Sequence, residues 1–482
     1  MGKFSPRVCL RPPQGAGAEE SSRSGIPLDN PQGLDVRLFA NPDVPFERDA
    51  FEQLFDFLDV ARAASDVRDA EKHGAPAFFG DAPAGIDRVV LTPDFHKGSL
   101  VPVGTVARAR HMCIPQAIGN DVCCGMRLLV TDLPAEALEP HWPAIQKRLR
   151  AIFFAGERDI PMSPRQREAV RAHARGSFAT RRLFGFERFI QSSGQIDGRD
   201  PQIGCVGGGN HFVELQRIDA RFDGHAARAW GLSKGSLAIM IHSGSVGLGH
   251  AVGGHFMDRA RVIFPAGVQP PKGGFYPLPT SGPRAEEGLF YLDGMGNAAN
   301  FAFANRLFLG LMAVRAIEEA SGRSVSSRLV YDAPHNLVFR DEEVCPHRKG
   351  AAPAHGPSGG DWLGKPSSSP APWAPRATCS RARATKVRSR ALATAQAVRS
   401  RAGAPHTSRV TCSCARRRAF AWSVPSIRAP LPWHGGATSS RSTSGASWRR
   451  RPTRTRRWSR WSTPSRTRAS LARWLGSSRS AR

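Results

Sequence analysis

The last quarter of this sequence contains no acidic residue. Residues 367–482 carry 26 of the chain's 68 Lys and Arg and none of its 40 Asp and Glu. The first 366 residues therefore hold 42 basic and 40 acidic side chains, the charge balance of an ordinary soluble domain. The pI near 11.1 would by itself indicate a nucleic-acid binder, but it describes only the final segment.

The sequence also lacks export and membrane signals. No apolar run is long enough to span a bilayer, and the N-terminal residues lack the apolar stretch of a signal peptide. The nine Cys are scattered and do not form a disulfide framework. We therefore expect a cytoplasmic protein whose thiols are reduced and free to bind metal. The six Cys of the first 366 residues are Cys9, Cys113, Cys123, Cys124, Cys205 and Cys345.

Strand and helix patterns alternate irregularly over residues 34–366, which favours a mixed α+β domain. Residues 1–33 are rich in Gly, Pro and Ser and are expected to be flexible, and residues 367–482, without strand or helix period, are expected to be an unstructured basic tail. The predicted strands are 36–40, 89–91, 101–107, 126–131, 237–242 and 329–332, and the predicted helices are 46–61, 142–152, 164–174 and 297–320.

Two pairs of side chains with metal-binding chemistry lie close together in the sequence. Asp94 and His96 are expected in a tight Pro-Asp-Phe-His turn. Asp121 and Cys124 follow a flexible Gly-Asn step, and their spacing lets a carboxylate and a thiolate point at one ion. This mixed hard and soft donor set suits a transition metal such as Mn, Fe, Co or Zn. Taken alone, the second segment is more simply a turn that carries a buried cysteine.

Two glycine-rich segments each bring a histidine to the end of an apolar strand. Gly207–Gly209 precede Asn210 and His211, and consecutive glycines let backbone amides approach an anion closely. Farther on, a buried strand ends in His242, and a Gly/Ser loop leads to His250. The simpler alternatives are an ordinary turn for the glycines and a satisfied core residue for either histidine.

A fourth segment presents a histidine after a proline. Pro334 fixes the turn before His335, and the basic run His347–Lys349 that follows either binds phosphate or forms a solvated loop. The four segments together supply one Asp, one Cys and three His, each at a strand end or glycine turn. Packing alone does not require His and Gly to be paired at several separate places. We therefore predict one metal-centred site built around Asp121 and Cys124.

In this order the motifs resemble those of the RtcB family of GTP-dependent RNA ligases. The resemblance covers about Asp35 to Pro366, and so many motifs in one order make it specific. Two positions depart from the family pattern, because Cys123 stands where the family often has Asn and Val246 where it usually has Arg. The matching segments are Pro93–Gly98, Val101–Val106, Asp121–Gly125, Asn210–Phe212, His242–His250, Met295–Arg306, Asp332–Asn336 and His347–Gly350.

The resemblance implies mixed sheets with surrounding helices and a site for two Mn²⁺ ions. Cys124 would bridge the ions, Asp121 and His211 would complete one coordination set, and His242 and His335 would complete the other. The residues that the resemblance implies for GTP binding are Asn210, His211, Phe212, Val213, Glu214, His335 and Asn336.

The family reaction joins RNA ends through guanylate intermediates, in tRNA splicing or RNA repair. A 2′,3′-cyclic phosphate is opened, a His takes GMP from GTP and passes it to the RNA 3′-phosphate, and a 5′-hydroxyl then attacks and releases GMP. The implied partners are therefore RNA with 3′-phosphate and 5′-hydroxyl ends, and GTP. The metals would polarise phosphate oxygens, and a nucleophilic imidazole divides one difficult step into easier ones.

Two motifs that the family carries after His-Arg-Lys-Gly are missing: a Pro-Gly-Ser-Met-Gly phosphate loop and a Cys-His-x-Ala-Gly-Arg segment with the nucleophile. The sequence after Pro366 is instead rich in Arg, Ser, Ala and Trp, as an out-of-frame reading of a GC-rich gene would be. Codons can be chosen for residues 367–378 and 390–399 that spell both motifs once a single nucleotide is added before them. We therefore expect a one-nucleotide loss near Pro366, and no catalytic nucleophile in the chain as it stands.

Three classes of function stay open at this level. The first is an RNA ligase that is inactive here because its nucleophilic His is not encoded. The second is a non-catalytic remnant that binds metal and nucleotide. The third is a basic protein whose tail binds RNA through charge and Trp stacking.

Overall fold

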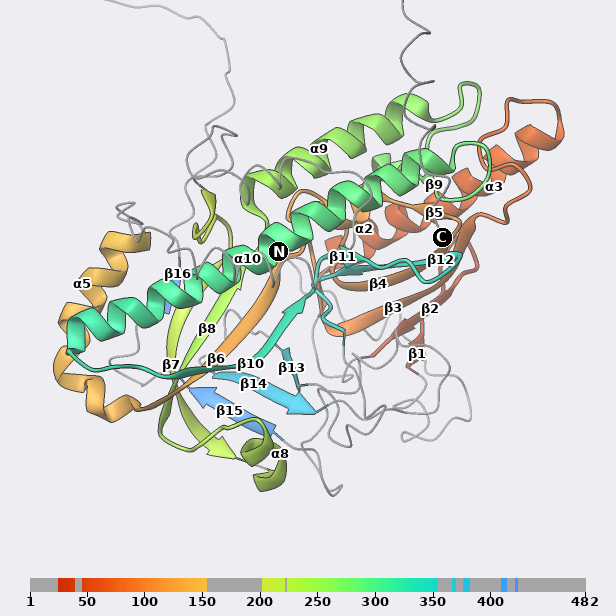
Figure 1. The fold of residues 1–482 in the computed structure, drawn as a ribbon. Helices are drawn as coiled ribbons and strands as arrows, with labels where there is room; N and C mark the ends of the chain where they lie inside the picture. The colour runs from red at the N-terminus through yellow and green to blue at the C-terminus, as the bar shows by residue number, and fades with distance from the viewer. Residues whose placement is uncertain are drawn as a thin grey trace, which may run out of the picture. The chain divides into compact units, whose positions relative to one another are not determined.

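The computed structural model describes residues 25–39, 46–153, 202–221 and 223–353, together with the backbone of four short strands between residues 366 and 423. The chain divides into two units, Met1–Ile427 and Arg428–Arg482, and all described residues belong to the first. Within these residues two large sheets and seven α-helices form a mixed α+β architecture (Figure 1), which confirms the predicted fold class.

The first large sheet has six strands. All neighbouring strands are antiparallel except the second and third, which run parallel. Their apolar residues alternate, so that one face packs into the main core. The strand order is β1 (Ile26–Pro27), β2 (Asp35–Leu38), β3 (Gly85–His96), β4 (Val103–Arg110), β12 (Val344–Lys349) and β11 (Leu337–Val338).

The second large sheet is antiparallel and buried on both faces at its centre. Ile239 and Ile241 face the main core, whereas Ala238 and Met240 face a second cluster beneath Trp230. Burial on both faces explains the unbroken apolar run before His242. The strand order is β10 (Ser327–Pro334), β6 (Gly125–Pro134), β8 (Ser236–Ser243), β7 (Phe212–Arg221), β15 (Arg409–Ser413), β14 (Arg376–Arg381) and β13 (Pro366–Ser369), with β16 (Ala421–Ser423) also paired to β7. A third sheet consists of β5 (Met112–Cys113) and β9 (Leu278–Pro279).

The long helix α10 (Ala285–Ser321) passes beside both large sheets in Figure 1 and contacts β8 of the second and β11 of the first. It ends at Gly322, whose φ of 66° is the left-handed conformation typical of a helix C-terminus. The other helices are α2 (Arg48–Leu58), α3 (Val60–Lys72), α4 (Pro115–Ile118), α5 (Trp142–Phe153), α8 (Gly224–Ala229) and α9 (Val246–Ile263), with 3₁₀ turns η2 (Ala135–His141) and η4 (Lys272–Gly274).

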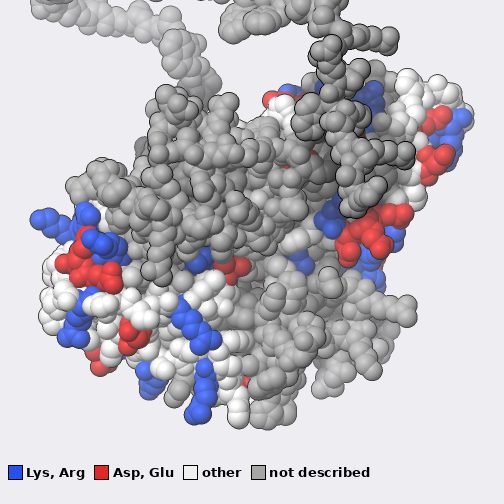
Figure 2. All heavy atoms as spheres, viewed as in Figure 1, with Lys and Arg blue, Asp and Glu red and all other residues white. Residues whose placement is uncertain are grey.

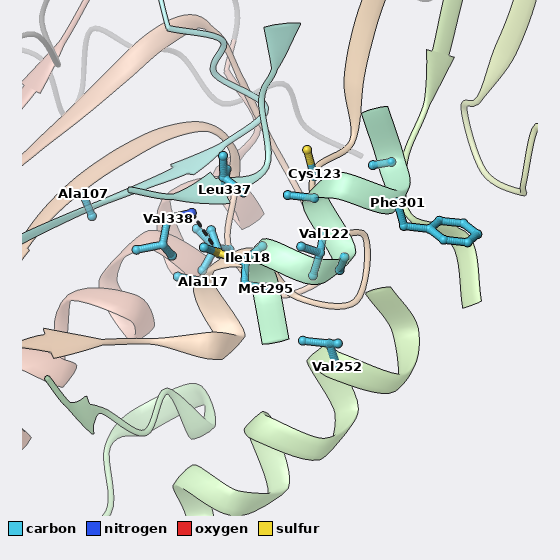
Figure 3. Close-up of a cluster of buried hydrophobic side chains, with 14 of the residues drawn as sticks. Ala107, Ala117, Ile118, Val122, Cys123, Val252, Met295, Phe301, Leu337 and Val338 are labelled. Carbon is cyan, nitrogen blue, oxygen red and sulfur yellow. Dashed lines mark hydrogen bonds between the residues drawn. The ribbon is translucent and has the colours of Figure 1, made fainter. Parts of the chain in front are cut away.

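The predicted metal-binding segment before β6 packs against helices α9 and α10. Figure 3 shows Val122 beside α10, with Val252 of α9 and Met295 of α10 nearby. All three side chains are buried, and the Val338 amide donates to the Met295 sulfur at 3.3 Å. The segment that carries Asp121 and Cys124 therefore rests on a close-packed apolar layer.

Several predicted elements differ from the structure in extent. The single helix predicted over 46–61 is divided at Asp59 between α2 and α3, and the Asp59 carboxylate accepts bonds from Arg62 and from the Lys272 amide. The tight turn predicted at Asp94 and His96 is wrong, since both residues lie at the end of strand β3. The predicted helix 164–174 lies outside the described residues.

Two segments predicted to lack structure contain short strands. β1 lies within the N-terminal segment that was expected to be flexible. β13 to β16 lie in the tail, and β15 and β16 pair with the outer edge of β7. An edge strand offers unpaired N–H and C=O groups, and β-forming residues such as those of β15 can satisfy them despite a strongly basic composition.

On the face shown in Figure 2, acidic and basic side chains of the described residues lie close to one another. Many of them are ion-paired, for example Arg110 with Asp87 at 2.7 Å and Lys97 with Asp49 at 2.7 Å. This agrees with the near-neutral balance of the first 366 residues. None of the helices in the described ranges is long and apolar enough to cross a membrane.

Candidate metal centre

The five predicted ligands meet at one end of the second large sheet. Cys124 directly precedes β6 and His211 directly precedes β7, whereas His242 lies near the end of β8 and His335 follows β10. In an antiparallel sheet the starts of some strands lie beside the ends of their neighbours. The register places Met126 and Phe212 on either side of His242, which brings side chains far apart in sequence together.

The ligand atoms form two groups that share Cys124. One group is Cys124, His242 and His335, and the other is Asp121, Cys124 and His211, with the ligand atoms of each group within 4.8 Å of one another. The Cys124 Sγ lies 3.0 Å from His242 Nε2 and 3.2 Å from His211 Nε2. His242 Nε2 lies 3.2 Å from His335 Nε2, and His211 Nε2 lies 3.3 Å from Asp121 Oδ2.

Two of the imidazoles are oriented by backbone carbonyls. His211 Nδ1 lies 3.0 Å from the Val206 carbonyl, and His242 Nδ1 lies 3.1 Å from the Asn210 carbonyl. Each Nδ1–H can donate to its carbonyl, which leaves the Nε2 lone pair facing the cluster. This outer support is typical of metal-ligating histidine.

The electrostatics of the cluster favour a cation. Burial holds the pKa of the Cys124 thiol well above its usual value, and the negative charge of Asp121 raises it further. Burial lowers the pKa of His335 to about 3 and holds that of His242 well below its usual value, so both imidazoles are neutral near pH 7. A bound cation would provide the positive charge that a buried thiolate requires.

Asp121 and His211 shift each other's pKa in opposite directions. Burial by itself would raise the pKa of the Asp121 carboxyl, but the charge and hydrogen bond of His211 outweigh it, and the pKa lies far below its usual value. Burial would lower the pKa of His211, and the charge of Asp121 raises it instead. The side chain of Asp121 is 40% exposed and marks the open side of the cluster.

The backbone around Cys124 is held by the segment that carries His335. The Cys124 carbonyl accepts the His335 amide at 2.8 Å, and the Cys123 amide donates to the Asn336 carbonyl at 2.7 Å. A Cβ on Gly125 would lie 2.6 Å from the Ala333 carbonyl, so a side chain there would push the two segments apart. Cys124 and His335 are therefore fixed to each other through their main chains.

The residues implied for GTP binding are only partly available to a ligand. Asn210 is exposed, and Glu214 is half-buried, with Gln216 bonded to its carboxylate at 2.7 Å. Val213 is buried in the main core, so only its backbone can contact a ligand. The Asn336 side chain is already engaged, since its amide donates to the Asp121 carbonyl at 3.1 Å and its oxygen accepts the Gly350 amide at 2.9 Å.

Other residues singled out from the sequence lie outside the cluster or inside the fold. Asp94 and His96 are exposed side chains that belong to neither ligand group, and His250 lies exposed on α9. The interpretation of His347–Lys349 as a solvated loop is wrong, because these residues form part of β12. His347 is buried and its Nε2 accepts the Ile114 amide at 2.9 Å, so this imidazole supports the fold.

Sequence reasoning did not assign a role to two polar side chains of α10 that contact the backbone next to the predicted ligands. Asn305 and Arg306 are fully buried, although the surrounding helix is rich in Ala, Phe and Leu. Their sequence context could have indicated a role, because an amide and a charge inside an apolar helix are buried only where they have hydrogen-bond partners.

Comparison with known proteins gives a consistent family assignment. The family model described as tRNA-splicing ligase RtcB matches residues 80–366. The chain is 31% identical over 305 residues to a tRNA-splicing ligase RtcB of Archaeoglobus fulgidus, covering 56% of this chain and 62% of that protein. It is 33% identical over 295 residues to an RNA-splicing ligase RtcB of Mycobacterium tuberculosis, covering 54% of this chain and 66% of that protein.

The similarity ends where the acid-free segment begins. The family match stops at residue 366, and residues 367–482 contain no Asp or Glu. The chain accordingly spans a little under two thirds of the length of the curated relatives described above.

Proposed function

The chain belongs to the RtcB family of tRNA-splicing ligases, and from this premise we propose that the cluster around Cys124 is the two-metal centre of an RNA ligase. One observation carries the proposal: a single thiol is shared by two ligand groups. A thiolate with lone pairs toward both groups can bridge two cations. A merely structural cysteine does not require a carboxylate and three imidazoles around it.

The donor set fits two divalent cations of the Mn²⁺ type. Asp121 and His211 would hold one ion, His242 and His335 would hold the other, and Cys124 would contact both. Bound divalent cations would supply positive charge that polarises phosphate oxygens. The chain's own contribution is orientation, since the carbonyls of Val206 and Asn210 fix two imidazoles and the neutral histidines keep their lone pairs free.

The segment before β7 supports nucleotide binding beside these ligands. A Cβ placed on Gly208 or Gly209 would meet no atom within 4 Å, so this part of the loop faces open space. The Asn210 side chain is exposed next to it. We propose that Asn210–Glu214, together with His335 and Asn336, lies against GTP, and that Val213 and Asn336 contribute through their backbone or by holding the loop.

The proposed substrate is RNA with a 3′-phosphate or 2′,3′-cyclic phosphate end, joined to a 5′-hydroxyl end. In this reaction a His accepts GMP from GTP with release of pyrophosphate, and the RNA 3′-phosphate then takes the GMP. We propose that the codon for this His straddles Ala393 and Thr394 and was lost from the reading frame near Pro366. The end of the family match at residue 366 supports this position.

Guanylate transfer tests the function. The chain as it stands should form no covalent GMP adduct with labelled GTP and Mn²⁺, because its nucleophile is not encoded. A version with one nucleotide restored near codon 366 should become labelled, and C124A in that version should remove the label. Labelling of the unrestored chain would contradict the frame-loss proposal, and absence of label from a folded restored version would contradict the ligase proposal.

The DNA provides an independent check of the reading frame. Codons for residues 367–378 and 390–399 that cannot spell the two missing motifs in the shifted frame would exclude a single-nucleotide loss. In that case the non-catalytic remnant, which keeps the metal cluster without the nucleophile, would be the better description.

A further inference from the structure

We propose that Arg306 is a positioning residue that holds three ligand-bearing segments of the metal centre in register. This inference rests on the proposed metal-binding function and concerns a residue that is itself no ligand. Arg306 lies on α10, and its side chain is 0% exposed. It contacts the backbone beside the ligands rather than the ligand atoms themselves.

The guanidinium contacts a backbone carbonyl next to each of two ligands. Nη1 donates to the Cys123 carbonyl at 2.8 Å and to the Ser243 carbonyl at 3.0 Å. Cys123 directly precedes Cys124, and Ser243 directly follows His242. A single nitrogen therefore sets the distance between the peptide units that present the shared thiol and one of its imidazole partners.

The third segment is connected through a carboxylate. Arg306 Nε donates to Asp332 Oδ1 at 2.7 Å, and Asp332 lies three residues before His335 at the end of β10. The other oxygen of Asp332 accepts Arg127 Nη1 at 2.8 Å. The planar guanidinium can hold a carboxylate and two carbonyls at once because its donors point in fixed directions, which the single ammonium of lysine cannot match.

The neighbouring Asn305 extends the same arrangement to the fourth segment. Its oxygen accepts the Gly204 amide at 2.7 Å, and its amide group donates to the carbonyls of Cys205 at 3.0 Å and Gly244 at 3.1 Å. Residues 204–210 lead into His211. Two adjacent side chains of one helix thus contact the backbone of three ligand-bearing segments and, through the Asp332 carboxylate, the fourth.

Because Arg306 is fully buried, the loss of any of these contacts would leave a polar group without a partner. Arg306 is enclosed by protein, with its Cζ 4.7 Å from the centre of the Phe303 ring. A buried charge must be paired and hydrogen-bonded to be retained. A role in stability alone would be met by the pair with Asp332. Arg306 also bonds the carbonyls of Cys123 and Ser243, which a role in stability does not require. These two residues are adjacent in sequence to the predicted ligands.

Cobalt binding tests the inference without depending on ligation. Co²⁺ added to the full chain should give a thiolate-to-cobalt charge-transfer band through Cys124. In R306M this affinity should fall by roughly 10–100-fold, the usual effect of removing an outer-shell partner. R306K keeps the positive charge but loses the planar set of N–H donors. Its Co²⁺ affinity should therefore also fall, and its charge-transfer band should change in shape.

Arg127 offers a matched control. It is a buried arginine, 4% exposed, that pairs with the same Asp332, and no hydrogen bond to the Cys123 or Ser243 carbonyl is found for it in the described residues. R127M should lower the melting temperature while its Co²⁺ affinity stays within about threefold of the unmodified chain, well short of the loss expected for an outer-shell partner.

The outcomes separate the two proposals. If the unmodified chain shows no thiolate band, the proposed metal centre fails, and this inference fails with it. If the unmodified chain binds Co²⁺ and R306K binds it equally well, the positioning role is overturned while the metal centre stands. A loss of affinity in R127M equal to that in R306M would also overturn it, since general destabilisation would then explain both. Should R306M not fold, R306K and R127M still decide the question.

Discussion

Cys124 is the side chain on which the chemistry of the described residues depends most. It is the one member common to both ligand groups, and it is nearly fully buried. The other four ligands each belong to one group. The loss of a ligand should therefore have different consequences according to whether one or both groups contain it.

This asymmetry can be measured by counting bound metal. C124A removes a ligand from both groups and should weaken the binding of both ions by more than the 10–100-fold typical of an outer-shell change. H335A leaves Asp121, Cys124 and His211 in place, so it should keep one Mn²⁺ or Co²⁺ ion per chain. Calorimetric titration gives the stoichiometry of each variant.

His250 provides the control for this comparison. It is an exposed histidine of α9 outside both ligand groups, so H250A should bind metal as the unmodified chain does. Equal stoichiometry in C124A and H335A would contradict the shared-thiol arrangement, since it would mean that the two groups do not bind ions separately.

The clustering of the five predicted ligands could be expected from the sequence, whereas the contacts that support them could not. Asp121, Cys124 and the three histidines follow glycine turns or strand ends, and a motif records that placement directly. The contact between Arg306 and the Cys123 carbonyl joins residues 183 positions apart. Backbone carbonyls occur at every position, so no residue type marks which of them will be bonded. Only the packing of α10 against the sheet determines that.

At the scale of elements, the start of α9 is strained. Val246 is the first residue of this helix and has a φ of 45°, a left-handed conformation that a β-branched side chain rarely adopts. Cys123 has a φ of 57°. At both positions the resemblance drawn from the sequence implies a different residue, and the Asn that it implies at position 123 adopts this conformation at lower cost.

A change at Val246 should reveal this strain. V246N should raise the free energy of unfolding by about 1 kcal/mol, because Asn adopts the left-handed conformation at lower cost. V262N is the same substitution in the same helix at a residue that is 72% exposed, so it should change stability by only a few tenths of a kcal/mol. Chemical denaturation measures both, and a V246N effect no larger than that of V262N would argue against strain at this position.

Element boundaries were harder to predict than element types. The apolar spacing of Phe51, Leu54 and Leu58 identified helix α2 correctly. The same spacing could not show that the helix is divided at Asp59, whose carboxylate accepts the Lys272 amide from more than 200 residues away. Similarly, Pro93 suggested a turn, but β3 extends to His96, which pairs with Val103 of β4 after a break in register between Leu91 and His96.

At the scale of the whole molecule, charge and family similarity divide the chain at the same place. The family match ends at residue 366, and all 40 acidic residues lie before residue 367. The 26 basic residues after that point are not balanced within the segment. RNA affinity can therefore have two sources, the proposed metal centre and this charge, and the charge should dominate in the chain as it stands.

The two sources respond differently to salt and to the chemistry of the RNA end. Binding through the basic segment should weaken steeply as salt rises, because each neutralised phosphate of a single strand contributes a slope of about −0.7 in log K against log salt. It should not distinguish a 3′-phosphate from a 3′-hydroxyl and should not require Mn²⁺. We expect this behaviour from the chain as it stands in titrations of fluorescent single-stranded RNA.

The frame-restored version should instead prefer the 3′-phosphate end in the presence of Mn²⁺ and show a shallower slope. A Mn²⁺-dependent preference for the 3′-phosphate in the unrestored chain would mean that the metal centre, and not the basic segment, dominates its interaction with RNA.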